Sequence, residues 1–193
     1  MTADVPEQTD QEVLALATQG NREAFGKLYE RYVAQIYSYI YYRTGNRHDA
    51  EDLTARVFMR AMHHIQDYKE RGLPVSAWLY RIAHNLVANW HRDNSRKQEI
   101  SLDDFEIAHQ HEDYPETHLM QSEQSEMLIK ALQDLPSERQ QLIILKFVEG
   151  LSNAEIGQIM GRTEGAIKSL YHRTLYGLRD VIGVEVSEIF NED

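Results

Sequence analysis

Several side chains near the C-terminal end of the sequence have the chemistry of a surface that reads duplex DNA. Their spacing places them on the outward face of one helix and at its start. Cationic, imidazole and hydroxyl side chains on such a face bind phosphate oxygens and hydrogen-bond to base edges in the major groove. The candidate contacts are Arg162, Thr163, Lys168, Ser169, His172 and Arg173.

A helix-turn-helix between Ser152 and Arg179 is the element that would position these side chains. Ser152-x-x-Glu155 predicts a capping box at the start of the first helix, and Thr163 can cap the second. Gly157 stands where the two helices cross closely, and Gly161 can take the left-handed conformation of a tight turn. The alternative is a helical hairpin that packs and binds nothing. The coincidence of caps, small residues and a basic outward face favours DNA binding.

The rest of the chain also has helical periodicity, with no convincing strand pattern. We expect a short helix capped by Asp10, a long one capped by Asn21, and two more over about 49–64 and 76–93. Trp78 and Trp90 are interpreted as core residues, and the stretch 37–42 as partly buried helix surface. Ser137-x-x-Gln140 predicts another capping box.

These elements predict an all-α protein of two small helical domains. The first covers residues 1–95 and the second, which contains the helix-turn-helix, covers 118–182. The polar segment 96–117 reads as a flexible acidic linker, and 183–193 as a C-terminal tail.

Catalytic and metal-binding patterns are weak. Adjacent His63 and His64 point to different helix faces, and no histidine pair has the i, i+4 spacing with a nearby glutamate typical of a zinc hydrolase. Histidines at 109, 111 and 118 fall in or beside the predicted linker. Phosphate-cradling glycine loops and nucleophile elbows are also lacking. We therefore expect no enzyme activity, no cofactor and no metal.

The charge of the chain opposes independent binding to DNA. The formal net charge is −11, and residues 96–130 hold nine acidic but only three basic residues. Repulsion from phosphate opposes the gain from counterion release, so a larger partner should hold the DNA reader in place. The chain has no cysteine, no long apolar run and no signal-peptide pattern at its start, which predicts a cytoplasmic protein without membrane insertion.

Four segments, 49–61, 76–86, 135–140 and the helix-turn-helix, resemble parts of the bacterial RNA polymerase sigma factors of the extracytoplasmic-function (ECF) group, in the sigma-70 family. The segment 49–61, DAEDLTARVFMRA, resembles the helix with which sigma factors grip the β′ clamp helices of polymerase. The segment 76–86, SAWLYRIAHNL, resembles the helix that reads the minus-ten promoter element. The segment 135–140 and the helix-turn-helix resemble the domain that reads the minus-thirty-five element. The first domain is thus sigma-2-like and the second sigma-4-like.

The resemblance implies roles for individual residues. Polymerase contacts would be Asp49, Glu51, Asp52 and Phe58. Minus-ten contacts would be Lys69, Gly72, Leu73, Pro74, Ser76, Arg81, Asn85, Asn89 and Arg92. The helix-turn-helix set given above falls on the minus-thirty-five positions. The sequence departs from the family where Ala55-Arg56 replaces a frequent Gln-Glu pair, and where Lys168 replaces a more frequent arginine.

The resemblance also implies partners. They are core RNA polymerase, through its β′ clamp helices and β flap, promoter DNA and an anti-sigma factor. The linker would enter polymerase channels that later hold nucleic acid, where its acidity would mimic phosphate. The alternative function is a helix-turn-helix regulator that binds its operator without polymerase.

Overall fold

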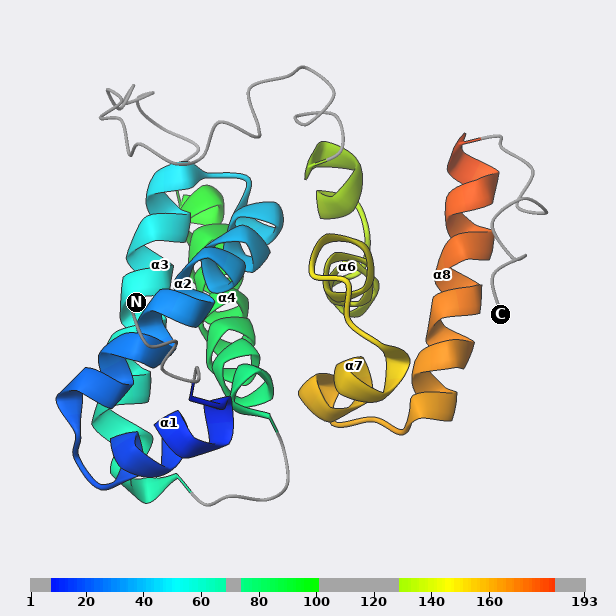
Figure 1. Cartoon of the computed structure of the whole chain (residues 1–193). Helices are drawn as coiled ribbons and strands as arrows, with labels where there is room; N and C mark the ends of the chain where they lie inside the picture. Colours follow the sequence, from blue (N-terminus) through cyan, green and yellow to red (C-terminus); the bar gives the residue numbers. More distant parts are fainter. Residues whose placement is uncertain (1–7, 69–73, 101–128, 183–193) are drawn as a thin grey trace, which may run out of the picture.

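The computed structural model describes residues 8–68, 74–100 and 129–182 of the 193-residue chain. All regular elements in these ranges are helical. As Figure 1 shows, they form two groups, which we call the N-terminal bundle (α1–α4) and the C-terminal bundle (α6–α8). The prediction of two helical domains is confirmed.

The N-terminal bundle consists of α1 (Asp10–Thr18), α2 (Arg22–Thr44), α3 (Arg47–His64), the short 3-10 helix η1 (Ile65–Asp67) and α4 (Val75–Ile100). Helices α2, α3 and α4 pack on one another, and α1 crosses the start of α2. The buried side chains recur at three- and four-residue steps, so each helix turns one apolar stripe inward. Ile36, Leu53, Leu79 and Leu86 are at most 2% exposed. Trp78 and Trp90 pack partly buried against this core, as expected.

The caps of the first two helices differ in how well the sequence predicted them. Asn21 caps α2, and Gly45 ends it with a positive φ of 67°. Helix α1, however, is capped by Thr9 in a capping box with Glu12, and the expectation that Asp10 caps it was wrong. The Asp10 carboxylate instead pairs with Arg31 and accepts a hydrogen bond from Tyr32.

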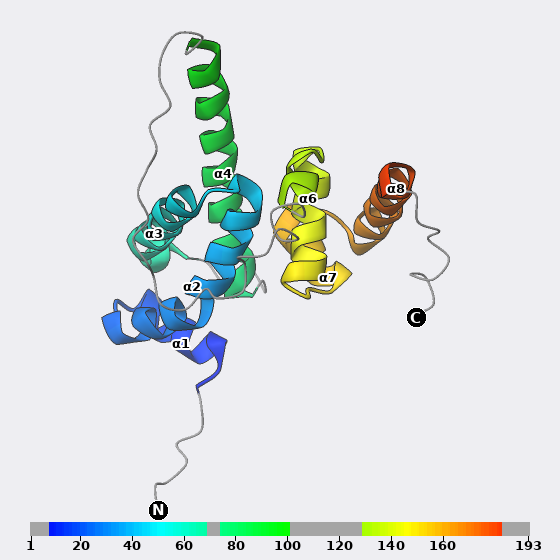
Figure 2. The ribbon, with the colours of Figure 1, turned by 90° about the horizontal axis from the view of Figure 1, so that it is seen from above.

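Helix α4 runs past its expected end at Asp93 and reaches Ile100. Figure 2 shows its C-terminal turns projecting beyond α2 and α3. The first residues assigned to the linker, 96–100, are therefore helical. The remainder of that segment, 101–117, and the tail 183–193 lie outside the described residues.

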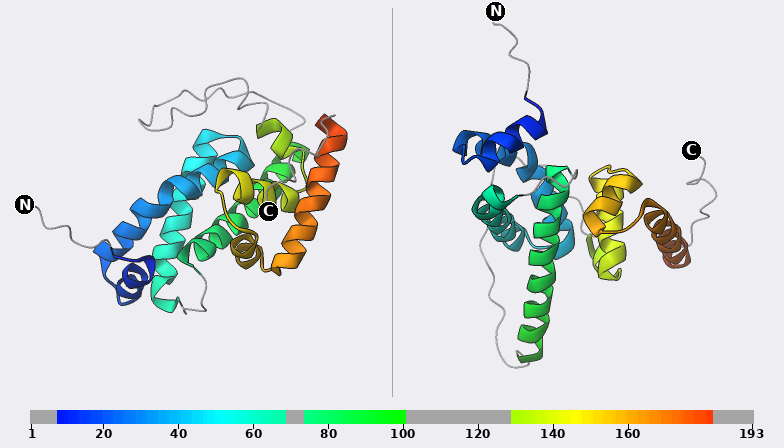
Figure 3. Two further views of the ribbon diagram at one scale, coloured as in Figure 1. Left: turned by 45° about the vertical axis from the view of Figure 1, so that its right-hand side comes forward. Right: turned by 90° about the horizontal axis from the view of Figure 1, so that it is seen from below.

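The C-terminal bundle begins with a helical turn over 129–133. It continues with α6 (Ser137–Ile143), the π-helical segment η2 (Ile144–Val148), α7 (Asn153–Met160) and α8 (Glu164–Ile182). The capping box predicted for Ser137 is wrong, because Pro136 precedes α6 without a side-chain cap. Figure 3 shows α8 on the far side of α6 and α7 from the N-terminal bundle.

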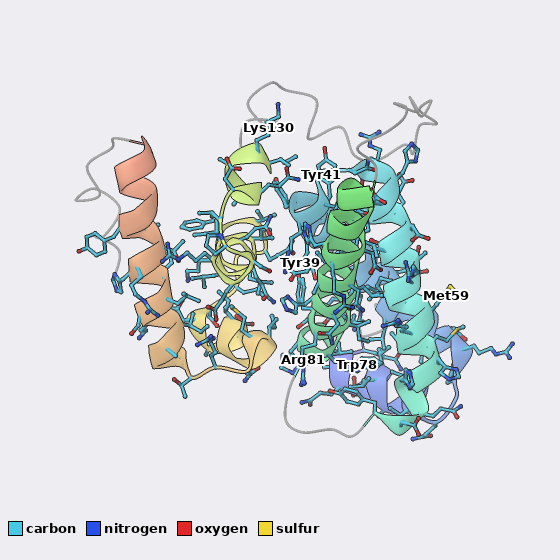
Figure 4. The ribbon with its side chains drawn as sticks, turned by 180° about the vertical axis from the view of Figure 1, so that it is seen from behind. Tyr39, Tyr41, Met59, Trp78, Arg81 and Lys130 are labelled. Carbon is cyan, nitrogen blue, oxygen red and sulfur yellow. The ribbon has the colours of Figure 1, made fainter. Side chains whose placement is uncertain are left out.

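The two bundles touch through a small set of elements. Helix α4 contacts α7, and the end of α2 contacts η2. Tyr39 and Tyr42, expected on a partly buried surface, are 0% and 6% exposed, because α2 is covered here by both bundles. Figure 4 shows Tyr39 and Arg81 on the side of the N-terminal bundle that faces α6 and α7. Within the described ranges, no helix is long and apolar enough to cross a membrane.

Candidate DNA and polymerase interfaces

The helix-turn-helix has the geometry that its sequence predicts. Ser152 and Glu155 form a capping box at α7, and Gly161 adopts φ 67° in the turn. The Arg162 amide donates to the Gly157 carbonyl at 2.8 Å, which closes the turn. A Cβ atom on Gly157 would lie 2.7 Å from the Arg162 carbonyl oxygen, closer than real Cβ contacts allow. The close approach of α7 to the following turn therefore requires glycine at 157.

The outward face of α8 carries the candidate DNA contacts in exposed positions. Thr163 caps the helix, its Oγ1 accepting from the Ala166 amide at 3.2 Å. The Lys168 ammonium lies 3.1 Å from the Glu164 carboxylate, one turn earlier. Arg173 donates through Nε to the Ser169 carbonyl at 3.3 Å, and His172 is exposed beside it. Since exposed ion pairs are weak, Lys168 can leave Glu164 for a phosphate at little cost.

Helix α4 presents a polar stripe at four-residue spacing. Arg81 and Asn85 are exposed, and Asn89 continues the stripe with its Oδ1 accepting from Arg92 at 2.7 Å. Such a stripe can track a nucleic-acid backbone along the helix. Among the residues before α4, Pro74 is exposed and Ser76 is half-buried. Three further minus-ten candidates, Lys69, Gly72 and Leu73, lie outside the described residues.

The polymerase-binding candidates lie on α3, from Asp49 in its first turn to Phe58 beyond its midpoint. Glu51 is 3.9 Å from His48, and Asp52 is 3.5 Å from Arg56. The Asp52 side chain is 68% exposed, so it can meet a partner. Asp49 is half-buried in the first turn, where a carboxylate favours the helix dipole. Phe58 is only 5% exposed and packs edge-on against Tyr29, so its ring supports this surface from beneath.

A cavity of about 530 Å³ lies between the two bundles. Arg81, His84 and Asn85 of α4 form one wall, and Gly161 and Arg162 of the helix-turn-helix contribute to the other. The Arg162 guanidinium is paired with the carboxylate of Glu138, which also lines the cavity. Residues predicted to contact the two promoter elements therefore face one another across this cavity.

Two polar contacts that the sequence did not predict join the bundles beside this cavity. Arg43, fully buried at the end of α2, donates through Nη2 to the Ser137 hydroxyl at 2.7 Å. The Tyr80 hydroxyl of α4 donates to the Glu149 carboxylate at 2.8 Å. Burial raises the pKa of the Glu149 carboxyl to about 7, and the hydrogen bond from Tyr80 opposes part of this rise.

Arg43 also organises its own bundle. Its Nη1 donates to the Tyr39 hydroxyl at 2.8 Å and lies 3.0 Å from His84 Nδ1. Burial and the neighbouring guanidinium lower the pKa of His84, which keeps its ring neutral and able to accept. At sequence level, Arg43 and Glu149 read only as polar residues near helix ends, so no local signal identified them.

Within the described parts of the chain, no group of three or more histidine, cysteine, aspartate or glutamate side chains is arranged to hold a metal ion. The histidines at 109, 111 and 118 lie outside those parts.

Comparison with protein families matches both bundles. Residues 28–97 match the family described as "Sigma-70 region 2", and residues 125–176 match "Sigma-70, region 4". The chain is 37% identical over 164 residues to the ECF RNA polymerase sigma factor BldN of Streptomyces coelicolor, covering 85% of this chain but only 62% of that protein. It is 31% identical over 171 residues to SigW of Bacillus subtilis, an ECF RNA polymerase sigma factor, covering 83% of this chain and 89% of that protein.

Two solved structures share the fold. CnrH, solved in complex with the cytosolic domain of CnrY, aligns with a TM-score of 0.66 at 21% identity, over 90% of this chain and 98% of that one. RpoE of Bartonella quintana, solved with the anti-sigma factor NepR, gives 0.62 at 23% identity, over 83% of this chain and 98% of that one.

A helix-turn-helix domain preceded by a region-2 bundle defines a sigma factor of the sigma-70 family. With matches to both regions and 31% identity across most of SigW, the chain belongs to the ECF RNA polymerase sigma factors, a family without enzymatic activity.

Proposed function

We propose that this chain directs promoter-specific initiation through three separate surfaces. The acidic face of α3 binds the β′ clamp helices of core polymerase. The stripe on α4 and the candidates between 69 and 76 that precede it bind the minus-ten element. Helix α8 reads the minus-thirty-five element in the major groove while its domain docks on the β flap. The observation that carries the proposal is that one chain exposes an acidic helix face on one bundle and a cationic recognition helix on the other.

Run-off transcription with purified core polymerase tests this function. We expect promoter-specific transcripts only when the chain is added to core enzyme, and feeble binding of duplex DNA by the chain alone. Tight, specific duplex binding by the isolated chain, without any transcript after core enzyme is added, would instead identify a polymerase-independent regulator.

We also propose control by an anti-sigma factor. CnrH and RpoE, which share the fold, were each solved with a bound protein, and the partner of RpoE is an anti-sigma factor. A partner that co-purifies with this chain should therefore be displaced by excess core polymerase, which can be followed by size-exclusion chromatography. Persistence of a ternary complex with core enzyme would contradict this form of control.

Arg56 explains how the family's polymerase surface is altered in this chain. Its guanidinium lies beside Asp52 and offsets its charge, whereas the family often has an acidic residue at this position. We expect Arg56→Gln to tighten binding to core polymerase by about two- to fivefold, because exposed pairs are worth up to about 1 kcal/mol. The matched control is Arg60→Gln, one turn further along α3 and also exposed. Fluorescence anisotropy of labelled protein titrated with core enzyme measures both, and weaker binding of the Arg56 variant would contradict the expectation.

A further inference from the structure

The guanidinium of Arg43 is a buried positive charge without a counter-ion. Its side chain is 0% exposed, and its hydrogen-bonding neighbours are the hydroxyl groups of Tyr39 and Ser137 and the ring of His84. Its Nε atom is buried with no hydrogen-bond partner. The ion pairs formed among the described residues do not include it. Because a buried cation is costly unless it is paired, this position favours an anion nearby.

Arg43 leaves two hydrogen-bond donors in the wall of the cavity between the bundles. Ser137 and His84, to which it donates, both line that cavity. A guanidinium has no acceptor, so the Ser137 oxygen and the Nδ1 atom of His84 must accept from Arg43. The hydroxyl hydrogen of Ser137 and the Nε2–H group of His84 therefore remain available to donate. Such donors, with a positive charge behind them, suit the oxygens of a phosphate group.

The charged side chains of the cavity also favour an anion. Arg81 of α4, labelled in Figure 4, is exposed and pairs with no acidic side chain in the ranges that the structure describes. The Arg162 guanidinium is paired with Glu138, and both line the cavity. Two arginines thus stand against one glutamate, in a chain whose formal net charge is −11. A local excess of positive charge attracts anions even to an acidic protein.

Gln141 places a buried amide in the same cavity. Its side chain is 4% exposed and lines the cavity wall that belongs to the C-terminal bundle. Within the described parts of the chain, this amide makes no hydrogen bond. A buried amide without a partner destabilises a protein, and a ligand that pairs with it would explain why it is there. A glutamine amide both donates and accepts, which matches the N7 and N6 positions of adenine.

Apolar side chains complete this wall. Ile159 is 4% exposed, Met160 is half-buried, and both line the cavity beside Gly161. Apolar side chains of this kind pack against the flat face of a ring, and the flexible thioether of methionine adapts to its shape. The cavity volume of about 530 Å³ lies within the range of small-molecule sites.

We propose that the cavity between the bundles is a binding site for a small adenine nucleotide. The phosphate accepts hydrogen bonds from Arg81, His84 and Ser137. The base pairs with the Gln141 amide and packs against Met160. The site does not depend on the proposed function.

Isothermal titration calorimetry of the full chain with adenosine monophosphate (AMP) tests the site. We expect a single site per chain with a Kd on the order of 10–100 µM, which is ordinary for a ligand of this size. Adenosine and inorganic phosphate, which each carry only part of the recognised groups, should bind at least about tenfold more weakly. No binding of AMP at about 1 mM would overturn the site.

Guanosine monophosphate tests the assignment of the base. Guanine presents two acceptors at the edge where adenine presents a donor and an acceptor, so the Gln141 amide cannot make both hydrogen bonds with it. We expect this nucleotide to bind at least about fivefold more weakly than AMP. Equal affinities would overturn the pairing of the base with Gln141.

Gln141→Leu separates a binding role of the amide from a structural one. It should weaken AMP binding by about tenfold, and the free variant should melt at or above the wild-type temperature, because leucine removes an unpaired buried amide. The matched control is Gln140→Leu, since Gln140 is 3% exposed but does not line the cavity. It should bind AMP within about twofold of the wild type. Unchanged AMP affinity in Gln141→Leu, together with a lower melting temperature, would show that the amide is structural.

Arg81→Gln tests the phosphate contact at an exposed position, where the change does not endanger folding. The variant should bind AMP no better than adenosine, whereas its affinity for adenosine stays at the wild-type value. Arg92→Gln is the control, because Arg92 is also exposed on α4 but does not line the cavity. Equal losses in both variants would mean that total charge attracts the nucleotide, and would overturn the site.

A nucleotide within single-stranded minus-ten DNA carries the same groups as AMP, so this strand is titrated in parallel. A strand that binds more tightly than AMP and loses affinity equally in Gln141→Leu would assign the cavity to promoter DNA and overturn the nucleotide site. The titration with AMP contains neither polymerase nor promoter. A chain that binds AMP but gives no run-off transcript therefore keeps the site and loses the proposed function, and a chain that transcribes without binding AMP loses only the site.

Discussion

Replacing Glu51 and Asp52 together by lysine is expected to reduce binding to core RNA polymerase by about a hundredfold or more. The two side chains lie on the acidic face of α3, where the Glu51 side chain is 33% exposed and that of Asp52 is 68% exposed. Their reversal would turn the proposed attraction to a basic surface of β′ into repulsion, and like charges across an interface cost several kcal/mol. Titration of labelled protein with core enzyme, at two salt concentrations, measures the loss.

A charge-matched variant shows whether the effect is local. Glu23→Lys with Glu30→Lys makes the same change in net charge at exposed positions of α2. This control should bind core enzyme within about twofold of the wild type at moderate salt, because distant exposed charges are screened. Equal losses in both variants would mean that total charge, not the α3 face, determines binding.

Gly157→Ala is expected to disable the helix-turn-helix while leaving the N-terminal bundle folded. The added Cβ atom would lie 2.7 Å from the Arg162 carbonyl, a backbone atom that cannot rotate away. Relief requires α7 and the turn to separate, at a cost of about 1–3 kcal/mol, and this displaces α8 from its recognition geometry. We expect a lower melting temperature and loss of transcription from promoters that depend on the minus-thirty-five element.

Gly165→Ala is expected to raise the stability of the protein, whereas Gly157→Ala lowers it. A Cβ atom on Gly165, in the first turn of α8, meets nothing within 4 Å. Alanine here should stabilise the helix by about 0.5–1 kcal/mol, because it restricts the unfolded chain and favours the helix. Differential scanning calorimetry of both variants distinguishes the two cases. A Gly157 variant as stable as the Gly165 variant would show that α7 and its turn can separate without cost.

The helix-turn-helix could be predicted from the sequence because its caps and its turn are formed by residues that are close together in the chain. Ser152 bonds the amide three residues later, and Gly161 supplies its own turn. Asp10 and Ser137 were predicted to cap helices, and this was wrong because each side chain hydrogen-bonds to a residue far away in sequence. Asp10 binds Arg31 and Tyr32, and Ser137 accepts from Arg43, 94 residues away in sequence. A cap can be predicted only where no tertiary partner competes for it.

The end of α4 shows a second limit of sequence reasoning. The segment 94–100, NSRKQEI, is polar and lacks an apolar period, which favoured a linker. Arginine, lysine, glutamine and glutamate nonetheless have high helix propensity, so a helix already anchored by Leu79 and Leu86 can continue through them.

The sequence predicted which helix faces carry the candidate sites, but not which other parts of the protein these faces meet. The spacing correctly placed Lys168 and Arg173 at exposed positions, and Arg81 and Asn85, which the resemblance assigned, are exposed as well. It gave no sign that two of these would line a cavity shared with the other bundle, because that depends on how the bundles meet. The roles of these residues in binding DNA and polymerase stay predictions.

The placement of the two tryptophans makes the protein its own optical probe. Both belong to α4, and the C-terminal bundle contains none. The ring centroid of Trp78 lies 5.0 Å from that of Tyr68, the last described residue before the minus-ten candidates at 69, 72 and 73, and the ring centroid of Trp90 lies 4.8 Å from that of His91. Tryptophan emission therefore reports on the N-terminal bundle alone, so the proposed capture of a single-stranded promoter segment can be followed in unlabelled protein and told apart from events at α8.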